Sequence, residues 1–324
     1  MNVRCPPILL IVFNRPRQAR RMLDILRLVK PPVIYIAADA PRENHPEDQS
    51  NCAQVMNEFR SIDWKCEVKY KVNSINLGSW HAIPAAIDWF FLNEPMGIVL
   101  EDDCIPSQTF FAYCGLLLHK YQNDEVVMWI NGSNLGWNDS DGLYSYSYTK
   151  YAISWGWASW RRAWCCFQDY RNGPASKDKV RSTLDVVFPQ QRSHRLYWSA
   201  LFDYAYSFNN WDYRWMLAMW ASGGVACTPS VNLISNIGFG IEAVHGGSKN
   251  NPMASLVAQE CGGELLNRQS ESISRMLDRH FDRVLYKIGL VSIVKIRLIV
   301  LFPWARSVRA KLKRYVNRRV GVLS

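Results

Sequence analysis

Three consecutive carboxylates, Glu101, Asp102 and Asp103, directly follow the apolar run MGIVL at residues 96–100. Neighbouring negative charges repel one another, so their placement at the end of an apolar segment needs an explanation. Carboxylates at the end of a buried strand can hold a hard divalent cation, and such a cation can neutralise a diphosphate. The alternative is a solvated acidic turn, which is what an isolated triplet of this kind usually forms.

Two more candidate residues stand where apolar runs end. Arg15, in the segment NRP that follows ILLIVF, could pair with phosphate or nucleotide oxygens, or it could be a surface arginine at the start of a helix. Asp39 follows the run PPVIYIAA. It could accept hydrogen bonds from a ribose or a base, or it could simply end its strand.

Asp212 is a candidate general base because it stands among Trp211, Trp215 and Trp220. Aromatic neighbours can partly desolvate a carboxylate, which raises its pKa and suits it to accept a proton. The alternative is that these tryptophans, at helical spacing, belong to the core. His245, in the segment AVHGG, could contact a phosphate or a metal ion, or it could have a structural role.

A second tryptophan-rich segment, SWGWASWRRAW at residues 154–164, predicts a loop. Tryptophan faces stack well on sugar rings, so this loop could form a platform for a donor or an acceptor. A rigid, packed corner of the protein is an equally good interpretation.

Strands and helices alternate along the first part of the chain. Apolar runs predict buried strands at 8–13, 31–38, 96–100 and 126–130, with an alternating strand at 66–72. Helical spacing predicts helices at 17–29 and 79–91, and a third that is capped by Ser107. This order predicts an α/β fold in which a mostly parallel sheet is flanked by helices on both faces.

Ligands of such folds bind beyond the carboxyl ends of the strands, where Arg15, Asp39 and the acidic triplet would meet. After residue 131 the chain becomes rich in Gly, Asn, Tyr and Trp, which indicates loops and short strands. Residues 193–221 are expected to be helical, 223–240 to form a short strand pair, and 242–270 to be a mobile loop or linker.

Composition narrows the class of protein. The 324 residues allow one large domain or two modest ones, and the 9 cysteines, which include no metal-type CxxC pair, favour a reduced cytoplasmic protein. ILLIVF is too short to span a bilayer. A P-loop, a Rossmann GxGxxG and a GxSxG elbow are missing, and NRP is not the glycine-rich loop that nucleotide-charging pyrophosphorylases need after their first strand.

The net charge of +10 comes from the C-terminal region. Residues 283–324 hold 11 of the 38 lysines and arginines and no acid, which leaves 27 basic residues against 28 acidic ones. The apolar segment 285–304 is interrupted by Lys287, Lys295 and Arg297, so we expect a helix that lies in the interface of an anionic membrane. The alternative is a helix that packs on the domain. The nearly neutral remainder disfavours a nucleic-acid binder.

Eight segments, in order, resemble GT-A glycosyltransferases, in particular the inverting N-acetylglucosaminyltransferase I type and bacterial proteins of that relationship, some of which are labelled haemolysin-like. They are ILLIVFNRP, IAADAPR, NLGSWHAIPAAIDWFF, IVLEDDCIPSQTFF, ISWGWASW, WDYRW, PSVNLISNIGFG and VHGG, within about residues 8–247. The resemblance implies a GT-A (Rossmann-like) fold with a mixed, mostly parallel sheet, here followed by an amphipathic C-terminal tail.

The resemblance also implies roles on the nucleotide side of the site. Arg15 and Asp39 would contact the nucleotide, and His81, in the helix after NLG, would lie against the base. Asp102 would contact the ribose. His245 would belong to the same donor site, although Val244 stands where the family pattern has a hydroxyl residue before His-Gly.

The remaining implied roles concern the reacting groups. Glu101 would contact the donor sugar, Asp103 would be the protein ligand to Mn²⁺ or Mg²⁺, and Asp212 would deprotonate the acceptor hydroxyl. The predicted protein is therefore a metal-dependent inverting glycosyltransferase that takes a nucleotide sugar, with a UDP-sugar favoured, and a glycan or glycolipid acceptor. The alternative is a non-catalytic, membrane-binding or haemolysin-like protein.

The predicted organisation has three parts. Residues 1–248 would form the catalytic domain, with a donor half to about 130 and an acceptor half after it. Residues 249–282 would be a linker, and 283–324 a basic tail that binds membranes. We expect a bacterial enzyme of polysaccharide biosynthesis, cytoplasmic and peripheral on the inner face of the cell membrane.

Overall fold

The computed structural model describes residues 5–138, 144–171, 173–238, 252–261 and 273–302. Its strands, in chain order, are β1 (Ile8–Val12), β2 (Val33–Ala38), β3 (Glu67–Val72), β4 (Met96–Glu101), β5 (Cys104–Pro106), β6 (Val127–Asn131), β7 (Tyr146–Thr149), β8 (Trp157–Trp160), β9 (Val225–Pro229) and β10 (Ile234–Asn236).

Its helices are α1 (Pro16–Val29), α2 (Pro46–Arg60), α3 (Ser79–Asn93), α4 (Gln108–Lys120), α5 (Arg161–Cys165), α6 (Gln168–Arg171), α7 (Lys177–Val187), α8 (Arg192–Ser207), α9 (Trp211–Ala221), α10 (Arg275–Phe281) and α11 (Leu290–Leu301). A short 3₁₀ turn, η1 (Pro252–Ser255), and a π-helical turn, η2 (Asp282–Tyr286), complete the described elements.

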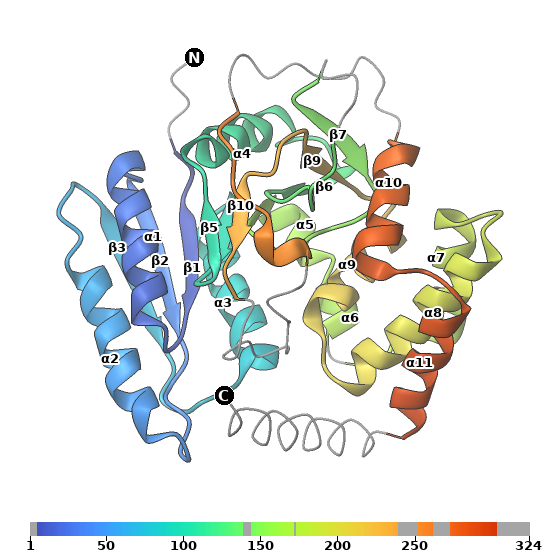
Figure 1. Cartoon of the computed structure of the whole chain (residues 1–324), viewed down its shortest axis with the longest axis horizontal. Coiled ribbons are helices and arrows are strands. Elements are labelled where there is room, and N and C mark those ends of the chain that lie inside the picture. The colour runs from blue at the N-terminus through green and yellow to red at the C-terminus, as the bar shows by residue number, and fades with distance from the viewer. Residues whose placement is uncertain (1–4, 139–143, 172, 239–251, 262–272, 303–324) are drawn as a thin grey trace, which may run out of the picture.

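Within the described residues, eight strands form one mixed, mostly parallel sheet in the order β3-β2-β1-β4-β8-β6-β9-β7. The first four strands in that order are mutually parallel, and β6 is parallel to β9, whereas β8 and β7 are antiparallel to their neighbours. The carboxyl ends of β1 and β2 point to the lower edge of Figure 1. The α/β fold predicted from the sequence is confirmed.

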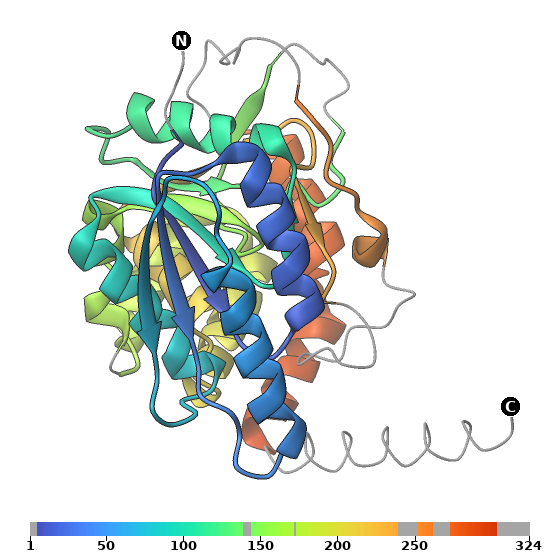
Figure 2. The same ribbon diagram turned by 90° about the vertical axis from the view of Figure 1, so that its left-hand side faces the viewer.

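Alternating burial along β1 explains the layers. Ile8, Leu10 and Val12 pack on one face of the sheet with the buried sides of α1, α2 and α4. Leu9 points to the other face, where α3, α8 and α9 contribute to a larger core. Figure 2 shows α1 and α2 side by side in front of the strands. Successive residues of β1 therefore pack into the two different cores, and helices cover both faces of the sheet.

Most predicted elements of the first 131 residues form within a few residues of their expected bounds. Ser107 stands at the N-cap position of α4, but its side chain makes no capping hydrogen bond. Its hydroxyl lies 3.3 Å from Thr109 Oγ1 instead, and the Glu260 carboxylate accepts hydrogen bonds from the backbone N–H groups of Gln108 and Thr109. A distant acid thus caps this helix.

Two local predictions were wrong, and one helix was not predicted. The unpredicted helix is α2, which begins at Pro46 and buries Val55 and Phe59. The expected tryptophan loop contains β8, which lies between β4 and β6 inside the sheet. The two strands at 223–240 both form, but they do not pair with each other, because β9 joins the main sheet and β10 pairs with β5.

The predicted parts of the chain also share structure. β7, β8 and β9 come from the predicted acceptor half but complete the sheet begun by the donor half. Within the predicted linker, α10 buries Leu277 and Phe281, and its Asp278 accepts a hydrogen bond of 2.6 Å from the Thr149 hydroxyl. This helix is therefore anchored on the domain.

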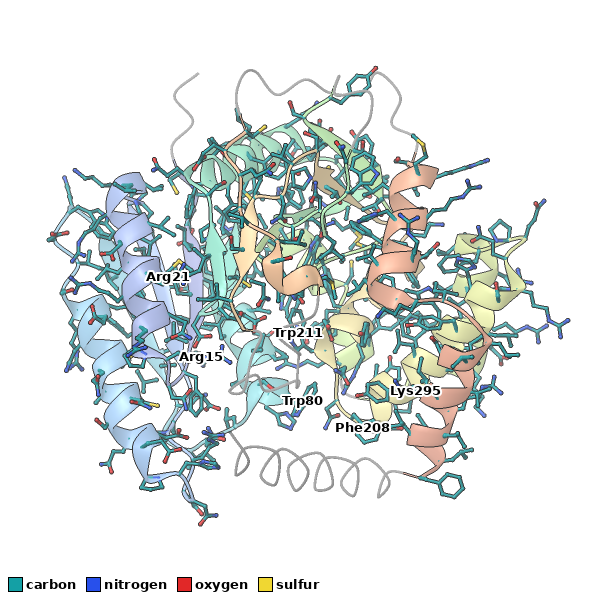
Figure 3. The ribbon with its side chains drawn as sticks, viewed as in Figure 1. Arg15, Arg21, Trp80, Phe208, Trp211 and Lys295 are labelled. Carbon is teal, nitrogen blue, oxygen red and sulfur yellow. The ribbon has the colours of Figure 1, made fainter. Side chains whose placement is uncertain are left out.

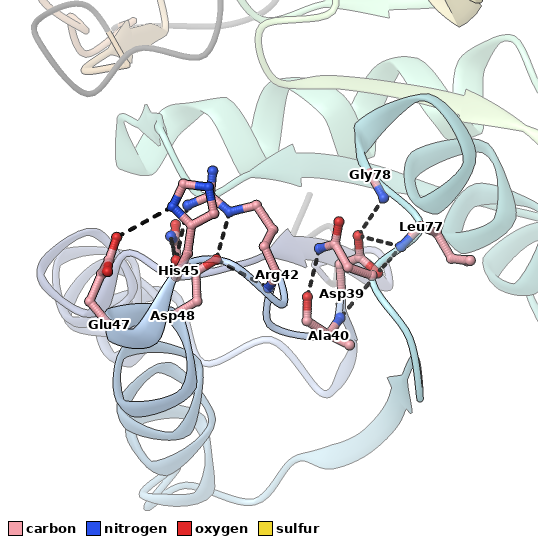
Figure 4. A network of polar contacts seen from close by, with 10 residues as sticks. Asp39, Ala40, Arg42, His45, Glu47, Asp48, Leu77 and Gly78 are labelled. Carbon is pink, nitrogen blue, oxygen red and sulfur yellow. Dashed lines mark hydrogen bonds and ion pairs between the residues drawn. The ribbon is translucent and has the colours of Figure 1, made fainter.

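A buried carboxylate, Asp48, ties together the loops that follow β1 and β2 (Figure 4). It is fully buried and accepts hydrogen bonds from Asn14 Nδ2 at 2.6 Å, from Arg42 Nε at 2.6 Å and from Arg42 Nη2 at 3.0 Å. The Arg42 guanidinium, helped by Asn14 and opposed by burial, lowers the pKa of Asp48 from 3.8 to about 2. Asp48 therefore links Asn14, which precedes Arg15, to Arg42, which lies three residues after Asp39.

We expect Asp48→Asn to lower the free energy of unfolding at pH 7 by about 2 kcal/mol, an upper value because Arg42 is partly exposed. Since the folded state lowers this pKa, the stabilisation is complete above about pH 4 and is lost as the pH falls toward 2. Urea unfolding at pH 7 and pH 3 tests this, with the exposed Asp63→Asn as control. An equal loss at both pH values would contradict the account.

Candidate active site

The acidic triplet lies at the carboxyl end of the central strand β4. Glu101 is the last residue of β4, Asp102 and Asp103 form the turn that follows it, and Cys104 begins β5. β5 pairs with β10, so that Cys104 stands opposite Asn236, and the Ile237 N–H donates to the Asp103 carbonyl at 2.9 Å. The turn is therefore held from two sides.

Arg15 is the cationic partner of this turn. It follows β1 and precedes Pro16, the first residue of α1. Its Nη1 lies 2.7 Å from Asp102 Oδ1 and 3.2 Å from Asp103 Oδ2, and all three side chains are at most 21% exposed. The convergence of Arg15 with the triplet, expected from the shared edge of parallel strands, is present. The Arg15 Nη1 therefore occupies a position at which the carboxylates of Asp102 and Asp103 both contact one positive charge.

The surroundings of the turn disfavour three full negative charges. Burial raises the pKa of Glu101 well above its usual range, and repulsion from Asp103, Asp102 and Asp212 adds to the effect. Burial likewise raises the pKa of Asp102 to about 6, against the opposing charge of Arg15. Such a cluster can bind additional positive charge.

Asp212 influences the acidic turn electrostatically from another part of the chain. It lies in the first turn of α9, where the helix dipole favours a negative charge, and it is partly buried. Its carboxylate contributes to the raised pKa values of Glu101, Tyr213 and Tyr286. The structure therefore brings Asp212 into the electrostatic neighbourhood of the acidic turn.

Asp39 is engaged by the protein itself (Figure 4). Its carboxylate accepts hydrogen bonds from Asn73 Nδ2 at 2.9 Å, from the Leu77 N–H at 3.0 Å and from the Gly78 N–H at 2.8 Å. These contacts fix the loop that leads into α3. His81 lies in the first turn of that helix with an exposed side chain. Asp39 thus positions the segment that presents His81.

The tryptophans divide between core and surface. Trp157, Trp160 and Trp164 are at most 3% exposed, and the Trp157 ring stacks on that of Trp129 with centroids 3.8 Å apart, so the packed interpretation of residues 154–164 holds for these side chains. Trp215 and Trp220 are also core residues.

The aromatic side chains Trp80 and Phe208 are only partly buried. In Figure 3, both lie with Arg15 and Trp211 in the lower half of the molecule, toward which the carboxyl ends of β1 and β2 point. They are therefore better candidates for a sugar-stacking surface than the tryptophans of β8.

Gly238 is a site residue that the sequence analysis did not single out. A Cβ atom at this position would fall 2.1 Å from Asp103 Oδ2, so only glycine lets the backbone after β10 lie against this carboxylate. The segment NIGFG contains it, but its role depends on the pairing of β10 with β5. His245 and Val244 lie outside the described residues.

The carboxylates of the acidic turn are suited to bind a cation that a bound ligand also contacts. Within the described ranges, no group of three or more His, Cys, Asp or Glu side chains forms a complete metal site. Asp102 and Asp103 nevertheless direct one oxygen each at the Arg15 Nη1. Mg²⁺ and similar ions are often held by one or two carboxylates, with phosphate oxygens and water completing the shell.

No protein-family model and no curated protein matches this chain. Solved structures give distant similarities. HddC from Yersinia pseudotuberculosis, complexed with GMP-PN, is 9% identical over 49% of this chain and 78% of that chain, with a TM-score of 0.30. An apo UDP-glucose pyrophosphorylase is 8% identical over 71% of this chain and 92% of that chain, with a TM-score of 0.38. Values this low assign no function to the chain.

We expect Arg15→Ala to lower the free energy of unfolding by about 2–3 kcal/mol, because it leaves partly buried carboxylates without their cation. Arg20→Ala, which removes an exposed arginine that pairs with Asp24 and Glu58, should lower the free energy of unfolding much less, because solvent screens these pairs. Chemical denaturation measures both. Millimolar Mn²⁺ should restore more stability to Arg15→Ala than it adds to the wild type; equal effects would contradict a shared cation position.

Gly238→Ala should cost about 1–3 kcal/mol, because the new methyl group must displace the Asp103 carboxylate or the backbone of its own loop. Gly173→Ala is the matched control, since a Cβ there meets nothing within 4 Å, and it should change stability by less than about 0.5 kcal/mol. Thermal unfolding compares the two variants. Equal melting temperatures of the two variants would show that the backbone at Gly238 does not lie in close contact with the Asp103 carboxylate.

Proposed function

We propose that this chain is a metal-dependent inverting glycosyltransferase, which moves a sugar from a nucleoside-diphosphate sugar to a hydroxyl of a glycan or glycolipid. The observation that carries the proposal is the pairing of Arg15 with Asp102 and Asp103 at the carboxyl end of β4, with the Asp212 carboxylate among the charges that raise the pKa of Glu101. This is the edge of an α/β sheet at which ligands bind. The excess of carboxylates over the single arginine favours a ligand that brings a cation.

The donor would bind through its diphosphate. Asp103 would hold Mn²⁺ or Mg²⁺, which when bound supplies positive charge to the diphosphate and so stabilises the leaving group, and Asp102 would contact the ribose. Arg15 would then be free to turn from the carboxylates to a phosphate oxygen, for which its guanidinium is suited. Asp39 would fix the loop that presents His81 to the nucleotide base, and UDP is the nucleotide we favour.

Asp212 would act on the acceptor. Its carboxylate would take the proton of the acceptor hydroxyl, whose oxygen forms a bond to the anomeric carbon as the bond from that carbon to the diphosphate oxygen breaks. The nucleoside diphosphate leaves from the opposite face, so the configuration at the anomeric carbon is inverted. Glu101, the last residue of β4, would contact the donor sugar.

A nucleotidyltransferase role is less well supported. Only Phe13, Asn14 and Arg15 separate β1 from α1, and none of them is glycine. A glycine-rich loop that could wrap the phosphates of a nucleoside triphosphate is therefore missing at this point of the sheet.

A panel of nucleotide sugars, assayed with Mn²⁺ for release of nucleoside diphosphate, tests the proposal. Asp212→Asn should retain donor binding but lose about 10²–10⁴-fold in turnover, because the amide cannot accept the proton. Asp103→Asn should lose Mn²⁺-dependent donor binding as well. Asp24→Asn, an exposed acid of α1, is the control. Near-normal turnover in both site variants, or no donor bound by the wild type, would refute the assignment.

A further inference from the structure

The helix α11 has two different apolar faces. Its inner face packs against α8 and buries Ile293, with Ile296 partly buried against the same core. Its outer face is exposed: Leu290, Val291, Val294, Leu298 and Leu301 are 48–83% exposed. Figure 1 shows α11 on the outside of the molecule at its right-hand edge. The packed interpretation offered by the sequence therefore holds for the inner face.

The exposed side chains form one stripe. At 100° per residue, the five positions from Leu290 to Leu301 fall within an arc of about 100° around the helix axis. Arg297 lies just outside one edge of that arc and Lys295 just outside the other, and both are exposed. An apolar band bordered by basic residues is the pattern of a helix that lies in a membrane interface.

The positive charge of residues 283–324 indicates what kind of partner binds the apolar stripe of α11. Residues 283–324 contain 11 basic residues and no acid. A second copy of this chain seated on the stripe would bring its own Lys295 and Arg297 against these cations without neutralising them. A bilayer that contains anionic lipids accepts the apolar side chains and also supplies the opposite charge.

We propose that the outer face of α11 is a docking surface for an anionic lipid bilayer. Its apolar stripe enters the boundary between headgroups and acyl chains, while Lys295 and Arg297 contact lipid phosphates on either side. None of the described helices is long and apolar enough to cross a membrane. α11, with 12 residues, is about 18 Å long and therefore lies along the surface. This proposal stands independently of the proposed chemistry.

Co-sedimentation of the full chain with vesicles tests this surface. Wild-type protein should sediment with POPC/POPG (7:3) vesicles in 0.15 M salt and remain in the supernatant with pure POPC. Val291→Glu combined with Leu298→Glu places two acids in the stripe and should weaken binding to the anionic vesicles at least tenfold. Both positions are at least half exposed, so the fold should be kept.

The matched control is Leu28→Glu combined with Val186→Glu, which changes equally exposed apolar residues of α1 and α7. It should bind as the wild type does. Binding of the stripe variant at wild-type strength would overturn the proposal, because the basic segment alone would then suffice. Equal binding of the wild type to both vesicles, or a dimer in light scattering that the stripe variant dissociates, would overturn it as well.

Discussion

Repulsion among carboxylates at the carboxyl end of β4 is the constraint on which the rest of the site depends. Glu101, Asp102 and Asp103 are consecutive, and Asp212 adds a fourth negative group from α9. A protein can bury such a cluster only if cations or protons offset it. Here Arg15 bridges two of the acids, and Glu101 has a raised pKa. The cluster costs stability, which is a common property of sites that bind a charged ligand.

The sheet provides the geometry that makes this cluster possible. β1 lies between β2 and β4 in a parallel arrangement, so the residues that follow these three strands share one edge. The carboxylates of Asp48 and Asp39 accept hydrogen bonds that fix the loops after β1, β2 and β3. The pairing of β10 with β5 places Gly238, which follows β10, close to the Asp103 carboxylate. The carboxylates of Asp48 and Asp39 thus stabilise the loops around the site, whereas those of Asp102 and Asp103 pair with Arg15 within it.

The sequence predicted the parts of the structure that depend on local patterns. Buried runs and helical spacing located β1, α1, β2, α3 and β4, and the shared edge of parallel strands placed Arg15 beside the acidic turn. β8 was missed because both faces of a central strand are buried, so its tryptophans show no alternation. α2 was missed because few of its residues are apolar, although Pro46 followed by two acids is a typical helix start. Two contacts could not be predicted, because each joins segments that are far apart in the sequence. They are the hydrogen bonds from the start of α4 to Glu260 and the close approach of Gly238 to Asp103.

The central claim is that Asp103 exchanges its pairing with Arg15 for a metal ion when a nucleoside diphosphate binds. Anomalous diffraction from a crystal grown with Mn²⁺ and UDP measures this directly. The account predicts a manganese peak in direct contact with an Asp103 carboxylate oxygen and with diphosphate oxygens, with the Arg15 guanidinium displaced toward the phosphates. Bound UDP without manganese at Asp103, and with the Arg15 pairs to Asp102 and Asp103 unchanged, would contradict it.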